Sequence, residues 1–261
     1  DLDRIKTNYL EKGWDVLGWQ NEDKLAKDKQ YAVGGATSGA LPEAVNDAIQ
    51  NTLAEYAKDY LPTPNPKSVT INGAAYDLVA FYYPDHDTAW DTVYQGQFLT
   101  NFFPCRITLT INGISGSFYN AEAAFQATKW WSHDSIRRQF EKAKTGTQAF
   151  KIKKDLKGED SSYAGLGGDG AMKKVLTEKF SDASFKQALL STGKAYLLEH
   201  NEAKGRDQAG WSDDMDGHAQ DPSKKLNRLG ETLMEVRESL GGAGRPSGNY
   251  TLADFSAGVE S

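Results

Sequence analysis

The sequence has almost no cysteine and no long apolar run. Cys105 is the only cysteine among 261 residues, so no disulfide can form within the chain. A chain without disulfides is typical of a reducing compartment, and we expect an intracellular protein, cytoplasmic or nuclear. No apolar stretch approaches the roughly 18 residues that a membrane-spanning helix requires, so we expect no such helix.

Basic charge is scarce overall but concentrated in one segment. Acidic residues outnumber basic ones by 36 to 30, which gives a net charge of −6. Residues 137–157 nevertheless carry eight basic side chains against two acidic ones. An acidic protein is a poor partner for an extended duplex, but this segment could hold one nucleotide or a short single strand by its phosphates. The alternative is a solvated helix face.

Prolines and glycines divide the chain into three parts. Apolar residues at helical spacing predict a helix over 42–60, and the prolines at 62, 64 and 66 cannot continue it. Gly241 and Gly242 end the last apolar stripe. We therefore expect a partly helical N-terminal extension over 1–66, a main domain over 67–240 and a flexible C-terminal tail over 241–261.

Strand signals come first and helix signals follow. Asn72-Gly73 and Asn112-Gly113 are hairpin turns, so we expect hairpins over 68–82 and 107–118. Asn120 is a good N-cap for a helix over 121–131, Ser181 for a helix to about 192, and a last helix is predicted over about 223–240. This order predicts an α+β fold, a mainly helical domain with a small antiparallel sheet and a helical N-terminal extension.

Several apparent motifs carry little weight. Residues 165–170 match the dinucleotide pattern G-x-G-x-x-G, but no predicted strand precedes them, so we expect no Rossmann site. Residues 212–223 echo a calcium loop that ends in serine where a bidentate glutamate belongs. The four histidines lack zinc-ligand spacing, and Cys105 has the context of a small buried residue. We expect no metal and no cofactor.

The helix predicted over 121–131 carries polar groups among alanines and aromatics. Glu122, Gln126 and Lys129 fall at i, i+4 and i+7, which places them on one stripe. Burying a carboxyl or an amine is costly unless the group is paired or used in chemistry. The stripe is therefore a candidate active site, a buried structural pair, or the solvent face of an otherwise buried helix.

Ordered motifs around this helix resemble the NADAR family, also called YbiA-like. Along the chain they are residues 94–104 (YQGQFLTNFFP), the E-x-x-F-Q-x-x-K pattern from Glu122 to Lys129, residues 190–194 (LSTGK), 211–213 (WSD) and 226–237 (LNRLGETLMEVR). The resemblance covers about residues 77–240 and implies an N-glycosidase. Some members are linked to riboflavin-pathway intermediates, and others remove ADP-ribose from guanine.

The resemblance also implies which residues form the site. Three residues would be catalytic, namely Glu122, Lys129 and Asp213. The substrate would be bound by Gly96, Phe98, Asn101, Phe102, Phe125, Gln126, Trp211 and Asn227. Extra residues around 204–210 leave Asp207 and Asp214 as alternatives to Asp213. The family's Ser-Asn-Phe stands here as Thr100-Asn101-Phe102, and residues 165–170 lack the tryptophan that bacterial members have.

Cleavage of a ribosyl C1–N bond builds positive charge on the sugar, which a carboxylate beside C1 stabilises. Glu122 is our first choice for this role or for activating water. The resemblance offers a second route, in which the Lys129 amine captures the opened sugar as a Schiff base, and burial among aromatics would favour the neutral amine. Trp211 could stack on a base, and Asp213 could orient a ribose hydroxyl or protonate the leaving base.

We therefore expect a hydrolase of N-glycosyl bonds that releases ADP-ribose from guanine, in nucleic acid or as a nucleoside, as in DNA damage reversal. One alternative is an N-glycosidase for a riboflavin-pathway ribosylaminopyrimidine. Another is a module that binds ADP-ribose or NAD without turnover.

Overall fold

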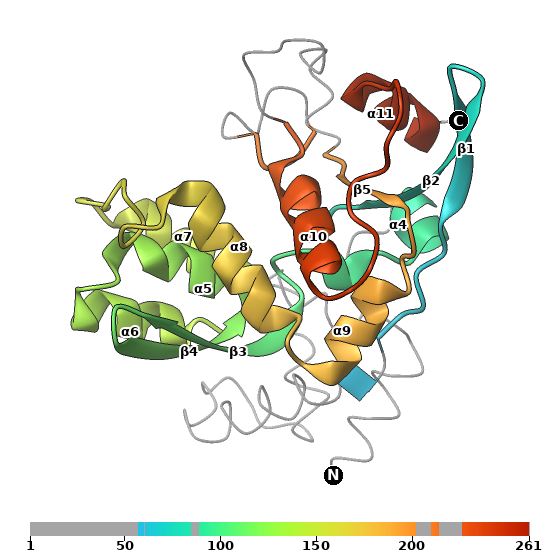
Figure 1. The fold of residues 1–261 in the computed structure, drawn as a ribbon. Coiled ribbons are helices and arrows are strands. Elements are labelled where there is room, and N and C mark those ends of the chain that lie inside the picture. Colours follow the sequence, from blue (N-terminus) through green and yellow to red (C-terminus); the bar gives the residue numbers. More distant parts are fainter. Residues whose placement is uncertain (1–56, 60, 85–88, 202–209, 214–225, 261) are drawn as a thin grey trace, which may run out of the picture. The chain divides into compact units, whose positions relative to one another are not determined.

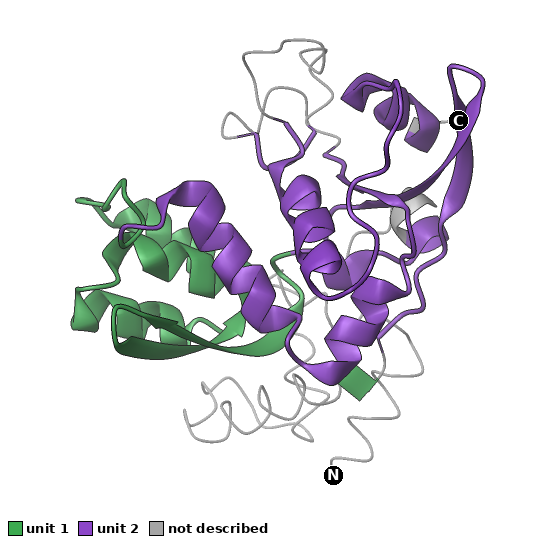
Figure 2. Ribbon diagram, in the orientation of Figure 1, with its two compact units in different colours: residues 1–59, 84–86, 101–164 green, residues 60–83, 87–100, 165–261 purple. Residues whose placement is uncertain are grey.

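The computed structural model describes residues 57–59, 61–84, 89–201, 210–213 and 226–260 (Figure 1). The chain divides into two compact units, coloured separately in Figure 2, and each is described by itself. Unit 1 contains residues 101–164, and unit 2 contains 60–83, 87–100 and 165–261. The helix expected over 42–60 lies outside the described residues except for 57–59, which are helical. The domain boundaries drawn from the sequence stay predictions.

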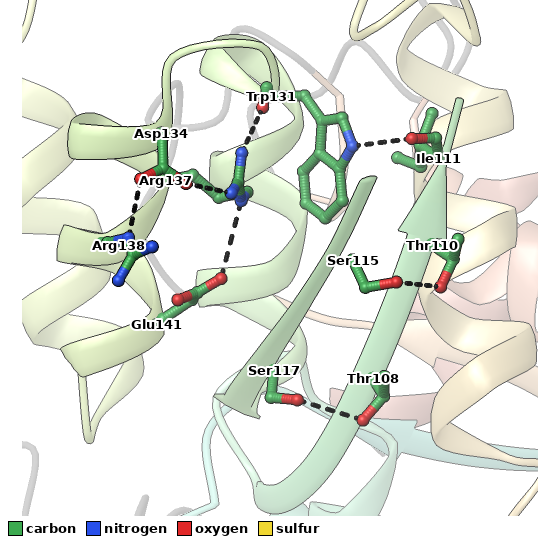
Figure 3. Close-up of polar contacts among 10 residues, drawn as sticks. All are labelled: Thr108, Thr110, Ile111, Ser115, Ser117, Trp131, Asp134, Arg137, Arg138 and Glu141. Atoms are coloured by element: carbon green, nitrogen blue, oxygen red, sulfur yellow. Dashed lines mark hydrogen bonds and ion pairs between the residues drawn. The ribbon is translucent and has the colours of Figure 1, made fainter. Parts of the chain in front are cut away.

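Unit 1 packs its helices against a two-stranded hairpin. Strands β3 (Pro104–Ile111) and β4 (Ile114–Asn120) pair antiparallel, as predicted. Both turn residues, Asn112 and Gly113, have the positive φ that a type I′ turn requires. Along β3 every second side chain is buried, beginning with Cys105, which confirms its expected role as a small core residue. On the other face, Thr108 bonds the Ser117 hydroxyl (Figure 3).

The predicted helix after Asn120 forms, in two parts. The Asn120 side chain accepts the Ala123 N–H at 2.8 Å, so this N-cap is confirmed. Helix α5 (Ala121–Ala127) then tightens into the 3₁₀ helix η3 (Thr128–Trp130). The Thr128 hydroxyl donates to the Phe125 carbonyl at 2.6 Å, a local bond that competes with the α-helical ladder.

Helices α6 (Asp134–Lys142) and α7 (Gly146–Asp155) complete unit 1. Arg137, which is buried, donates to the Trp131 carbonyl at 2.8 Å and pairs with Asp134 (Figure 3). Arg138 pairs with the same carboxylate at 2.7 Å. Its hydrogen bond is the main reason why the pKa of Asp134 is lowered. Two of the eight basic residues in segment 137–157 are therefore paired within α6, and three of the other six lie on α7.

Unit 2 is built on a three-stranded sheet in the order β1-β2-β5. Strands β1 (Lys67–Ile71) and β2 (Ala74–Phe81) form the predicted hairpin. Strand β5 (Tyr196–Glu199) pairs with β2 in parallel, a pairing that the sequence did not predict. Helices α4 (Ala89–Tyr94), η2 (Gln97–Leu99), α8 (Gly167–Lys179), α9 (Ala183–Leu190), α10 (Arg228–Ser239) and α11 (Leu252–Glu260) belong to this unit. The α+β fold class is confirmed.

Two predicted helix starts are corrected. The N-cap of α9 is Asp182, whose carboxylate accepts the N–H groups of Ser184 and Phe185, whereas the Ser181 hydroxyl donates to the carbonyl of Glu178. Helix α10 begins at Arg228 because Asn227 has a left-handed backbone (φ 55°), which ends any helix from the preceding side.

The expectation of a flexible tail over 241–261 is wrong for its described part. Residues 252–260 form α11, and the ring of Phe255 is fully buried. It stacks on Tyr196 of β5 with centroids 4.1 Å apart and planes 2° from parallel. Tyr76 and Tyr250 meet the same ring edge-on. Burial of aromatic area fixes a segment whose glycine-rich approach had suggested mobility.

The G-x-G-x-x-G segment begins within a series of turns over 161–166, and its last four residues form the first turn of α8, so a turn and not a strand precedes it, as predicted. Among the described helices, none has both the length and the hydropathy that crossing a membrane requires.

Candidate functional site

The polar stripe of α5 and η3 is buried. Glu122, Gln126 and Lys129 are 7%, 7% and 8% exposed, respectively, and every other residue of α5 is buried too. The stripe is therefore not a solvent face, which removes one of the three alternatives drawn from the sequence. At the first turn of α5, the carbonyl of Asn101 accepts a hydrogen bond from the N–H of Glu122 at 2.9 Å.

Burial changes the proton affinity of Glu122. Desolvation raises the pKa of this carboxyl. A hydrogen bond from Gln126, at 2.9 Å, and the charges of Lys129 and Lys153 act in the opposite direction without cancelling the rise. A carboxyl whose pKa is raised keeps its proton to a higher pH than an ordinary carboxyl and can give it up during a reaction.

Gln126 has an oxygen without a partner. Its Nε2 donates to Oε1 of Glu122, but its buried Oε1 has no hydrogen-bond partner within the described part of the chain. Buried polar atoms in native proteins are nearly always bonded, and the exceptions need an explanation. A hydrogen-bond donor on a ligand would satisfy this oxygen, beside the carboxyl whose pKa is raised.

Lys129 carries a charged partner and an aromatic surround. Its Nζ lies 3.6 Å from Oε2 of Glu159, and 5.4 Å and 6.0 Å from the ring centroids of Tyr163 and Phe125. The sequence predicted burial among aromatics, which the structure confirms for Phe125. It did not predict the ion pair with Glu159.

The loop over 96–103 spans the boundary in sequence between the two units, and its predicted ligand contacts stay predictions. In unit 2, Gly96 lies against β2, where a Cβ would come within 3.1 Å of the Ala80 carbonyl, and Phe98 is a core residue with no exposed surface. In unit 1, the ring of Phe102 lies against Gly146, where a Cβ would approach it to 2.4 Å. These contacts give Gly96, Phe98 and Phe102 packing roles.

Trp211 and Asp213 belong to unit 2. The guanidinium of Arg228 lies 4.0 Å from the centroid of the half-buried Trp211 ring. Asp213 is 1% exposed, and its backbone extends the edge of β5 through an N–H bond to the Glu199 carbonyl at 2.8 Å. Its Oδ2 lies 3.2 Å from Nδ1 of His200 and accepts the hydroxyl of Ser256. Asp207 and Asp214, the alternative acids, lie outside the described residues.

Asn227 joins β5 to α10. Its Oδ1 accepts the Glu199 N–H at 2.9 Å, and its Nδ2 donates to the Leu197 carbonyl and to the Tyr196 hydroxyl. The side chain is fully buried. These bonds give Asn227 a structural role in unit 2, while the ligand contact expected from the sequence stays a prediction.

Sequence reasoning missed two buried polar residues. His200 was considered as a zinc ligand and as the end of the segment 197–200 (LLEH) that follows the LSTGK motif, but not as the buried partner of Asp213 that it is, at 1% exposed. Lys179 is 1% exposed, and its Nζ donates to the Thr100 carbonyl at 2.7 Å. Lys179 lies in no recognisable motif. Within the described residues, no group of three His, Cys, Asp or Glu side chains could hold a metal ion.

The predicted site residues thus fall into two sets. Unit 1 brings together Glu122, Phe125, Gln126 and Lys129, and unit 2 holds Trp211, Asp213 and Asn227. The protein therefore has an α+β fold, and the first set places a carboxyl, an amide and an amine on one buried helical stripe. The NADAR domain family matches residues 82–241, and the chain belongs to this family. Members of the family are generally enzymes of the N-glycosidase type.

Two known proteins are similar to this chain. A riboflavin biosynthesis protein of Vibrio vulnificus is 30% identical over 182 residues, which cover 68% of this chain and 41% of that protein. The chain therefore spans about two fifths of the relative's length. The NMR structure of the Escherichia coli protein YbiA is 27% identical, with a TM-score of 0.47, covering 63% of this chain and 84% of that one.

Proposed function

We propose that this protein is an N-glycosidase that hydrolyses the C1–N bond between ADP-ribose and guanine, in nucleic acid or in nucleosides. The observation that carries the proposal is the buried stripe of Glu122, Gln126 and Lys129. A carboxyl of raised pKa, beside an amide oxygen that lacks a partner, is a usual arrangement for proton transfer in a binding site. Membership of the NADAR family supplies the reaction class.

The net reaction adds water across the C1–N bond. The water oxygen bonds to C1, its proton leaves, and the electron pair of the C1–N bond goes to the base nitrogen, which takes up a proton. Protonated Glu122 would supply that proton, and its carboxylate would then accept one from water and stabilise positive charge at C1. For Asp213 and Trp211 we propose the roles that the sequence resemblance implies, a contact to a ribose hydroxyl and stacking on a base.

A covalent route uses Lys129. The ring opens as the C1–O4 bond breaks, O4 takes a proton, and the base nitrogen forms a double bond to C1. The neutral amine adds to C1, the base leaves with the electron pair of its bond and a proton, and the lysine nitrogen becomes doubly bonded to C1. Water then hydrolyses this Schiff base to free ADP-ribose and the amine.

The partner that we propose for the α7 face is a short single strand. Lys151 and Lys154 are exposed there, and Lys154 lies 4.7 Å from the ring centroid of Phe150, which is itself 43% exposed. Cations beside an exposed ring bind strand phosphates and a stacked base. Next to them is a cavity of about 380 Å³, lined among others by Lys142, Gln148 and Ile152. Lys153 of the same helix acts electrostatically on Glu122.

Strand binding is tested with a fluorescent single-stranded 12-mer. We expect K151E/K154E to weaken binding by about tenfold. The variant should also show a smaller salt dependence, because fewer phosphates are contacted and fewer counterions are released on binding. Phe150→Ala should weaken binding at all salt concentrations. The matched control K173E/K186E, on α8 and α9, should bind as the wild type does. Equal binding by all variants would contradict the α7 docking face.

A second candidate function is an N-glycosidase for a riboflavin-pathway ribosylaminopyrimidine, favoured by the name of the Vibrio relative. Both substrates are offered to the wild type, to Glu122→Gln and to the control Glu178→Gln, an exposed carboxyl on α8. We expect release of ADP-ribose from guanine by the wild type and the control only. Cleavage of the ribosylaminopyrimidine alone would replace the first proposal, and tight ADP-ribose binding without any cleavage would indicate a binding module.

A further inference from the structure

The amine of Lys129 is held by a segment that the sequence motifs do not include. Residues 157–164, here called the strap, follow α7 in the chain and contact residues of α5 and η3. The N–H of Asp160 donates to the Lys129 carbonyl at 2.8 Å, and the indole of Trp130 donates to the Lys157 carbonyl at 3.2 Å. The first bond satisfies a carbonyl that the helix end leaves without an intrahelical partner.

The strap has a defined conformation of its own. The carboxylate of Asp160 accepts the N–H groups of Ser162 and Ala164 at 2.8 and 3.0 Å, and these bonds lower the pKa of Asp160. Tyr163 and Ala164 both have positive φ, at 53° and 59°. Such a backbone is unfavourable for residues with a Cβ and persists only where surrounding bonds enforce it. Asn112 of the β3–β4 turn donates to the Ala164 carbonyl at 3.3 Å.

This conformation brings two side chains of the strap to Lys129. Glu159 forms the ion pair at 3.6 Å, and Tyr163 stacks on Phe125 with ring centroids 5.5 Å apart. The lysine Nζ lies over the rings of both aromatic residues. A lysine side chain has several rotatable bonds and loses much entropy when it is fixed. The strap fixes it in the folded protein, before any substrate binds.

We propose that Glu159 is a positioning residue for Lys129. Its carboxylate holds the lysine Nζ at one place beside the Phe125 and Tyr163 rings until a substrate enters. The effect of Glu159 on catalysis rests on the proposed function. Its effect on the position of Lys129 rests on the described contacts alone. Glu159 is itself half exposed, at 52%, so it contributes little to folding and its variants keep the fold.

The other charged groups around Lys129 do not explain how its amine is held in place. Glu122 on α5 interacts with Lys129 electrostatically, but it is the group whose raised pKa favours the neutral form. The carboxylate of Asp160 is turned into its own loop. Lys153 on α7 acts on Glu122, and Tyr163 contributes its ring face.

The first test needs no substrate. Limited acetylation with acetic anhydride, read by mass spectrometry, measures how readily each lysine amine reacts with the reagent, with Lys186 as internal reference. Removing the carboxylate releases the amine from its ion pair, so we expect acetylation of Lys129 at pH 7 to be about threefold faster in Glu159→Gln, the size that a half-exposed pair supports. Glu159→Asp should stay near the wild type. The control Asp155→Asn, an exposed acid at the end of α7, should leave it unchanged.

The second test uses ADP-ribosylated guanine. We expect Glu159→Gln to lower kcat about tenfold with KM nearly constant, because the unanchored amine is seldom in place, and Glu159→Asp to regain part of the rate. A raised KM with constant kcat would make Glu159 a substrate-binding residue and overturn the proposal, as would unchanged acetylation. If the wild type fails to cleave this substrate, the proposed function fails, while the acetylation result still decides whether Glu159 positions the amine.

Discussion

Two buried polar groups, one in each unit, are bonded differently. In unit 2, the guanidinium of Arg237 is fully buried and makes bonds to Thr192, to Ala195 and to the carbonyls of Ala243 and Gly244. In unit 1, Oε1 of Gln126 has no hydrogen-bond partner among the described residues, and burial raises the pKa of Glu122. The first arrangement is complete within the protein, whereas the second leaves hydrogen-bonding capacity for a ligand.

This difference separates structural from functional burial. A fully hydrogen-bonded buried polar group stabilises one conformation. A partly bonded one lowers the stability of the fold, and such groups are expected at functional sites. The distinction also predicts how variants divide. Unit 2 variants should lose stability first, and stripe variants should lose activity while keeping or gaining stability.

The largest stability effect is expected at Arg237. Burial lowers the pKa of this guanidinium to about 10, so it stays charged at neutral pH. Arg237→Met removes bonds to four partners, of which Thr192 and Ala195 are buried, and we expect it to destabilise the protein by about 3 kcal/mol in urea unfolding. The control Arg245→Met, at a half-exposed side chain, should cost less than about 1 kcal/mol. Equal losses would show that burial and bonding do not set the difference.

A smaller loss is expected at Asn227. Asn227→Ala removes three hydrogen bonds and places alanine at a left-handed position, so we expect a cost of about 2 kcal/mol. The control Asn65→Ala, which loses one exposed bond, should cost a few tenths of a kcal/mol. If Asn227→Ala keeps its stability and instead raises KM, the residue contacts substrate, and the comparison between the units fails at this point.

The smallest effect has the opposite sign. The pKa of Glu122 is raised in the folded state. Its contribution to the free energy of unfolding is therefore fully present below the unfolded pKa, about 4.3, and is lost as pH rises through the folded pKa. Glu122→Gln removes that loss, and we expect it to be about 1 kcal/mol more stable than the wild type at pH 8 and equal to it at pH 4. Urea unfolding at both pH values checks this, with Glu178→Gln as control. A destabilised Glu122→Gln at pH 8 would show that the carboxylate is fully compensated.

Short-range chemistry made much of the fold predictable. The Asn-Gly turns define both hairpins and Asn120 defines the start of α5, because each depends on neighbours in sequence. The stripe of Glu122, Gln126 and Lys129 was predictable for the same reason, since helical periodicity alone places it.

Long-range contacts were not predictable. The parallel pairing of β5 with β2 joins residues more than a hundred positions apart, and the stacking of Phe255 on Tyr196 gives order to a segment with no strong helix signal of its own. The Lys129–Glu159 pair depends on the turn that Asp160 organises, and a charge pattern does not reveal which acid a loop returns to which lysine.

The most direct test of the account is an adduct experiment on the stripe itself. DNA carrying ADP-ribose on guanine is incubated with the wild type, Lys129→Ala and Glu122→Gln, reduced with borohydride and analysed by mass spectrometry. The account predicts that the wild type releases ADP-ribose and that both variants lose activity by about a hundredfold or more. A reduced adduct on Lys129 of the wild type, absent from Lys129→Ala, would identify the nucleophile. Undiminished cleavage by both variants would contradict the assignment of chemistry to α5 and η3.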